Sequence, residues 1–99
     1  MAHLLIVDDE PSICWGLRRL AEQMGHTASV AASAEQALAL ARQQRPEVVV
    51  MDVRLPGMDG LTALKKLHAE FGLLPVIVIT AFGDLPTAVE AVRSGAFDY

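Results

Sequence analysis

Short apolar runs alternate along this chain with longer segments in which apolar side chains recur every three or four residues. The runs are of strand length and cover residues 4–7, Thr27–Ala31, residues 48–51 and residues 75–79. The second of them has small residues and one Val, whereas the other three are rich in Leu, Ile and Val. A helical pattern follows each run, and residues 96–99 look like the start of a fifth strand. This alternation predicts a parallel sheet with helices on both faces.

Capping and breaking residues mark the ends of the first two helices. Pro11 suits a first helical turn, and Gly25 is placed to end that helix. Between them lies an apolar stripe at helical spacing: Ile13, Leu17, Leu20 and Met24. Ser33 and Gln36 have the spacing of a capping box, which predicts a second helix over Ala34–Gln43 before Pro46.

The third and fourth helices have weaker boundaries. Apolar positions that include Leu61, Leu64 and Leu67 predict a third helix, which Gly72 can end. A fourth is expected from an N-cap at Asp84 to a stop at Gly95, with an apolar stripe of four residues: Leu85, Ala88, Val89 and Val92. No repeat or linker divides the 99 residues, so we expect one domain.

The composition argues against several classes of function, among them nucleic-acid binding and a place in a membrane. Hydrophobic residues make up 53% of the chain and charged residues 20%, which is enough apolar material for one core. The net charge of −4 and the absence of a Lys/Arg run argue against nucleic-acid binding by this chain alone. The sequence has one cysteine, no signal-peptide pattern and no apolar run of membrane-spanning length. We therefore expect a soluble cytoplasmic protein.

Polar side chains that could bind a ligand or take part in a reaction lie at the ends of three of the predicted strands. Asp8 and Asp9 come after the first, Asp52 ends the third, and Thr80 ends the fourth. Ligands of open α/β sheets bind at the carboxyl ends of the strands, where the strand order reverses. If the order is 2-1-3-4-5, that point lies between the first and third strands, and these side chains converge in one crevice.

Three converging carboxylates repel one another, and at ~4 Å each pair costs on the order of 4 kcal/mol at an effective dielectric near 20. A hard divalent cation such as Mg²⁺ would offset this repulsion, because it prefers oxygen ligands and retained waters. The alternative is a carboxylate kept protonated by burial. Loops typical of nucleotide binding and the nucleophile elbow of hydrolases are missing, and the three histidines have no ligand spacing.

Four motifs in register resemble the receiver domain of two-component response regulators, over the whole chain. They are Ile6-Val7-Asp8-Asp9-Glu10, the run from Met51 to Gly60, Ile79-Thr80-Ala81, and Gly95-Ala96-Phe97-Asp98-Tyr99. Trp15 and the stretch from Thr80 to Tyr99 look most like the nitrogen-regulatory (NtrC-type) branch. The resemblance implies a flavodoxin-like α/β fold of strand order 2-1-3-4-5, with the fifth strand and last helix incomplete here.

The resemblance also implies roles at matching positions. Asp52 would accept a phosphoryl group from a sensor histidine kinase. Mg²⁺ would be bound directly by Asp9, mainly through water by Asp8, and by Asp52 and the backbone carbonyl of Arg54. The domain would catalyse only its own phosphoryl transfer and dephosphorylation, and switch shape to control an output such as transcription.

Three further positions match the family pattern toward the end of the chain. Thr80 would hydrogen-bond the phosphoryl oxygens, Ala81 would keep the phosphate approach open, and Tyr99 would turn inward as the aromatic switch. The family lysine expected three residues past Tyr99 is absent, so we expect residues 1–99 to be a receiver domain truncated at its C-terminus. Such a chain would self-associate, or else belong to a longer polypeptide with an output domain.

Several of these residues also have a simpler interpretation. Asp8 and Asp9 could favour a helix N-terminus electrostatically, Asp52 and Thr80 could be ordinary strand-end residues, and Cys14 is best read as a small packing or surface residue. Two other functions remain: an interaction module that is not phosphorylated, and a metal-dependent phosphatase with an aspartyl nucleophile. The second usually needs an acid two residues after the nucleophile, where this chain has Arg54.

Overall fold

The structure, a computed structural model, describes residues 2–52, 60–72 and 74–79. The elements in this part are β1 (His3–Val7), α1 (Pro11–Gln23), β2 (Thr27–Ala31), α2 (Ala34–Gln43), β3 (Val48–Asp52), α3 (Gly60–Phe71) and β4 (Val76–Ile79). Each lies where the sequence predicts it, to within about a residue at most ends. The expected fourth helix and fifth strand lie outside the described residues.

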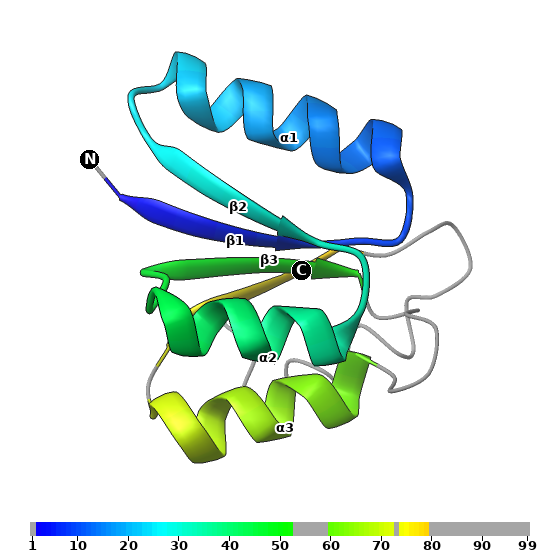
Figure 1. Cartoon of the computed structure of the whole chain (residues 1–99), viewed down its shortest axis with the longest axis vertical. Helices are drawn as coiled ribbons and strands as arrows, with labels where there is room; N and C mark the ends of the chain where they lie inside the picture. Colours follow the sequence, from blue (N-terminus) through cyan, green and yellow to red (C-terminus); the bar gives the residue numbers. More distant parts are fainter. Residues whose placement is uncertain (1, 53–59, 73, 80–99) are drawn as a thin grey trace.

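The strands form one parallel sheet of order β2-β1-β3-β4. The predicted order is confirmed for these four strands. In the register, Val7 of β1 is paired with Ala31 of β2 and with Met51 of β3. Figure 1 shows α1 on one face of the sheet and α2 with α3 on the other. The order of strands therefore reverses between β1 and β3, as the predicted ligand crevice requires.

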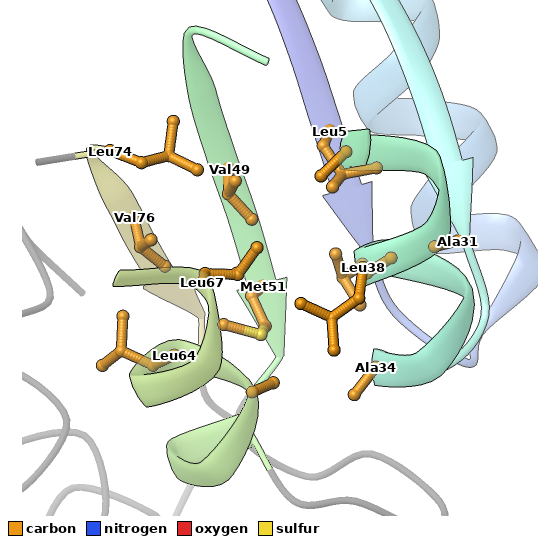
Figure 2. Close-up of a cluster of buried hydrophobic side chains, with 14 of the residues drawn as sticks. Leu5, Ala31, Ala34, Leu38, Val49, Met51, Leu64, Leu67, Leu74 and Val76 are labelled. Atoms are coloured by element: carbon orange, nitrogen blue, oxygen red, sulfur yellow. The ribbon is translucent and has the colours of Figure 1, made fainter. Parts of the chain in front are cut away.

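The main core lies between the sheet and the α2/α3 layer. Alternate residues of the strands point into it, among them Leu5, Val49 and Val76, and Leu38, Leu64 and Leu67 meet them from the helices (Figure 2). Most of these side chains are almost fully buried. Burying each contributes roughly 1.5–3 kcal/mol, so this layer is the principal stabilising contact of the described part.

Helix boundaries follow the predicted caps. The N–H of Gln36 donates to Ser33 Oγ (3.2 Å), and Gln36 Oε1 accepts from the N–H of Ala32 (2.9 Å), which together close the N-terminus of α2. Gly25 and Gly72 follow α1 and α3 with φ of 85° and 71°. Glycine adopts this left-handed conformation without a side-chain clash, so both helices end where the sequence predicts.

Helix α1 packs on β1 and β2 through small side chains rather than through its large apolar ones. Its buried residues are Cys14 and Ala21. Of the predicted stripe, Leu17 is half-buried, whereas Ile13, Leu20 and Met24 are 44%, 52% and 65% exposed. The predicted helix is confirmed, but most of its large apolar stripe is exposed, and its buried face carries the small residues Cys14 and Ala21.

Among the described helices, none combines the length and apolar character needed to cross a bilayer.

Candidate metal centre

Three aspartates meet at the carboxyl ends of β1 and β3. The register pairs Val7 with Met51, so the residues that follow them, Asp8 and Asp52, come side by side, and Asp9 is the next residue along. One carboxylate oxygen from each of the three lies within 4.8 Å of the others. This confirms the predicted convergence of Asp8, Asp9 and Asp52.

Asp8 is held in place by contacts through its main chain and its side chain. Its N–H donates to the carbonyl oxygen of Ala31 at the end of β2 (3.0 Å), and its Oδ1 accepts from the N–H of Glu10 (2.9 Å). Its carbonyl oxygen accepts from the thiol of Cys14 (3.2 Å). The carboxylate is thus held by the loop between β1 and α1, and the main chain of Asp8 is held by α1 and by the edge strand β2.

The three carboxylates differ in their access to water. Asp8 is only 4% exposed, Asp52 is half-buried and Asp9 is exposed. Burial raises the pKa of Asp8 above its usual range, and the negative charges of Asp52 and Asp9 raise it further against the opposing hydrogen bond from Glu10. The buried member of the cluster is therefore the one for which the charged form costs most.

The same loop borders a shallow groove of about 300 Å³ between the start of α1 and the end of β2. Asp8 and Asp9 line one part of it, and Cys14, Trp15 and Arg18 line the part formed by α1. Burial, followed by the charge of Asp8, raises the pKa of the Cys14 thiol, so the sulfur keeps the proton that it donates to Asp8. Trp15 is 64% exposed and stacks beneath the guanidinium of Arg19.

The donor set fits a hard divalent cation. All three candidate ligand atoms are carboxylate oxygens, from one buried, one half-buried and one exposed residue. A small cation there would reduce the mutual repulsion of the carboxylates, and the exposed side of the cluster leaves room for the waters that Mg²⁺ retains. The arrangement can therefore hold a cation next to Asp52, a carboxylate at the end of a central strand.

The remaining predicted site residues lie outside the described part of the chain. They are Arg54, Thr80, Ala81 and Tyr99, and their roles stay predictions. Sequence reasoning missed the contact of Cys14 with Asp8. Its only trace in the sequence is the position of a thiol in the first turns of the helix after the acidic pair, which is too weak a pattern to single out.

The sheet order, the helices on both faces and the acidic cluster at the switch point define a class of protein. A family model described as the response regulator receiver domain matches residues 4–99. The chain belongs to this family, whose members act in two-component signal transduction.

Its relatives within the family include regulators of the NtrC type. The chain is 43% identical over 94 residues to the DNA-binding transcriptional regulator NtrC of Salmonella typhimurium, covering 95% of this chain and 20% of the relative. It is 40% identical over 97 residues to the C4-dicarboxylate transport transcriptional regulatory protein DctD of Pseudomonas aeruginosa, covering 98% and 21%. The chain thus spans about a fifth of the length of these curated relatives.

Solved structures agree with the fold. The receiver domain of NtrX from Brucella abortus superposes with a TM-score of 0.92 at 36% identity, covering 96% of this chain and 81% of that one. A response regulator receiver domain protein from Clostridium thermocellum gives a TM-score of 0.94 at 30% identity, covering 100% and 80%. The predicted flavodoxin-like receiver fold is thereby confirmed at the level of its class.

Proposed function

We propose that this chain receives a phosphoryl group on Asp52 and passes on the signal by changing shape. The observation that supports this most strongly is the juxtaposition of Asp8, Asp9 and Asp52 at the switch point of a receiver-family sheet. A phosphoacceptor carboxylate needs an accessible position beside a bound cation, and Asp52 is half-buried at the end of β3.

The proposed reaction is an in-line displacement at phosphorus. A carboxylate oxygen of Asp52 forms the new P–O bond, and the bond from phosphorus to the donor's leaving atom breaks. That atom is the imidazole nitrogen of a phosphohistidine, or the carboxylate oxygen of an acyl phosphate, and it leaves with the bonding electron pair. The product is an acyl phosphate on Asp52, which water can later hydrolyse.

The acidic pair would hold the cation for this step. Asp9, which is exposed, is the proposed direct ligand, and Asp8 would act mainly through bound water, with the Arg54 carbonyl as a further ligand. Bound Mg²⁺ would supply positive charge opposite the phosphoryl oxygens. The hydroxyl of Thr80 would donate to one of those oxygens, Ala81 would leave the approach open, and Tyr99 would respond as the switch.

The same proposal includes the partners of the chain and its location in the cell. A sensor histidine kinase would be the physiological phosphodonor in the cytoplasm, and an output domain in a longer chain would read the switch. The domain would turn over no metabolite beyond its own phosphoryl group. A polypeptide of these 99 residues alone would self-associate through the exposed apolar residues of α1.

A magnesium titration, with and without an acyl-phosphate mimic, separates this function from the two alternatives. We expect weak Mg²⁺ binding that Asp9→Ala lowers more than Asp8→Ala, and tighter binding of the mimic when Mg²⁺ is present. An interaction module without phosphorylation would bind the mimic equally with and without Mg²⁺, or not at all. A phosphatase would release phosphate catalytically from small phosphate esters. Equal Mg²⁺ affinity in wild type and Asp9→Ala would place any cation elsewhere.

A further inference from the structure

The carbonyl oxygen of Asp8 is a buried polar group that needs a donor. Asp8 is 4% exposed, and a buried carbonyl without a partner costs about 1–3 kcal/mol. Within the described residues, the donor is the thiol of Cys14, six residues further along the chain. A side chain of α1 therefore satisfies the main chain of the residue that begins the acidic cluster.

Cys14 connects the loop to the helix at two points. Its N–H donates to the carbonyl oxygen of Glu10 (3.1 Å), which opens the hydrogen-bonding ladder of α1, and its thiol donates to Asp8. The side chain is 5% exposed, so water does not compete for either bond. The turn from Asp8 to Glu10 is thus fastened to a rigid helix rather than being free to reorient.

The contacts of Asp8 then determine which of its atoms is left for a cation. The N–H, the carbonyl oxygen and Oδ1 each have a partner among the described residues, in Ala31, Cys14 and Glu10. Of the polar atoms of Asp8, only Oδ2 has no hydrogen-bond partner among the described residues. Fixing three groups of one residue fixes the direction of the fourth, which is how supporting contacts tune metal ligands.

We propose that Cys14 is a positioning residue of the metal centre: its thiol holds the main chain of Asp8 so that the carboxylate is oriented for cation binding. Cys14 touches neither the cation nor the phosphoryl group in this account. The inference rests on the proposed function, because it assigns a role in the cation site of the same centre.

The test compares Mg²⁺ affinity in a matched pair of variants of the full chain. Cys14→Ser keeps a donor at the position and Cys14→Ala removes it. Trp15 is the only tryptophan and lines the groove beside Asp8 and Asp9, so its fluorescence can report the titration. We expect Cys14→Ala to weaken Mg²⁺ binding about three- to tenfold and Cys14→Ser to recover most of that loss.

A control separates positioning from general stability. Ala21 is the other buried residue of α1 and lies about two turns beyond Cys14, further from the loop. Ala21→Gly should destabilise the helix by roughly 0.5–1 kcal/mol and leave the Mg²⁺ affinity within twofold of wild type. Urea unfolding of the same samples shows how far each variant is destabilised.

The possible outcomes test the positioning role of Cys14 separately from the proposed function. If Cys14→Ala binds Mg²⁺ as well as wild type, if Cys14→Ser is as weak as Cys14→Ala, or if Ala21→Gly is weakened equally, the positioning role is wrong while the proposed function stands. If the wild-type chain binds no Mg²⁺, the proposed function fails and the positioning role fails with it.

Discussion

Asp8 lies where a negative charge is costly, because it is buried and has two other carboxylates nearby. Its hydrogen bond from Glu10 compensates only in part, and its pKa is raised. In the absence of a cation this residue therefore opposes folding at neutral pH. Stability sacrificed at one residue for the sake of binding is typical of functional sites.

The raised pKa of Asp8 makes its contribution to stability fall as the pH rises. The folded chain binds a proton at Asp8 more tightly than the unfolded chain does, so the stability from the protonated form is fully present below the ordinary pKa of 3.8. It is lost as the pH rises through the raised folded-state pKa. We expect Asp8→Asn, in a chelator, to equal wild type in free energy of unfolding at low pH and to exceed it at neutral pH.

Urea unfolding at a series of pH values measures this difference. Glu47→Gln is a suitable control, since Glu47 is an exposed acid at the opposite end of the strands. At each pH, the difference between Asp8→Asn and wild type is compared with that between Glu47→Gln and wild type. An Asp8→Asn variant that is less stable than wild type at neutral pH, or whose advantage does not grow with pH, contradicts the electrostatic account of Asp8.

The sequence predicted the cluster of three aspartates but not the contact of Cys14 that holds Asp8. Asp8, Asp9 and Asp52 could be brought together from the sequence because each follows a recognisable strand and parallel strands share one carboxyl edge. The role of Cys14 could not, because it depends on the rotation of α1 about its axis. No pattern in the sequence fixes that rotation.

At the scale of elements, the same rotation explains the exposed stripe of α1. Periodicity shows that Ile13, Leu20 and Met24 share a face, but it does not say which neighbour covers that face. Packing on β1 and β2 uses the adjacent face with Cys14 and Ala21 instead. Strands and caps were easier to predict, because continuous apolar runs and capping residues act locally.

The cap of α2 is a local contact that can be tested alone. Ser33 Oγ accepts from the N–H of Gln36, and Ser33→Ala leaves that donor without its partner. We expect a loss of about 1 kcal/mol in the free energy of unfolding, measured in urea. Ser12 lies in the first turn of α1 and makes no cap, so Ser12→Ala should cost less than about 0.5 kcal/mol. Equal losses in the two variants would contradict the cap assignment.

At the scale of the whole molecule, one face of the sheet is better covered than the other. The face toward α2 and α3 carries the buried cluster of Figure 2. On the face that carries α1, strand residues such as Val50 and Ile77 are only half-buried. The large exposed apolar side chains of the described residues all lie in α1 or at its C-cap, Met24. Apolar surface of this extent favours association.

We therefore expect a polypeptide of these 99 residues to self-associate with rising concentration. Replacing Leu20 and Met24, which are exposed, by Gln should shift the equilibrium toward monomer by at least severalfold without loss of folding. Replacing the exposed cations Lys65 and Lys66 of α3 by Gln serves as a control on a surface outside α1. Light scattering with an intact-mass check decides the matter, and a wild-type chain that stays monomeric at all concentrations rules out this association.

Phosphorylation of Asp52 is the claim on which the account of the whole molecule depends. The most direct measurement is the intact mass of the chain after incubation with a small acyl phosphate and Mg²⁺. Asp52→Asn keeps the shape of the side chain but replaces the carboxylate by a far poorer nucleophile. We expect one phosphoryl group on the wild-type chain, dependent on Mg²⁺, and none on Asp52→Asn. Equal phosphoryl incorporation in the two chains would contradict the assignment of Asp52 as the phosphoacceptor.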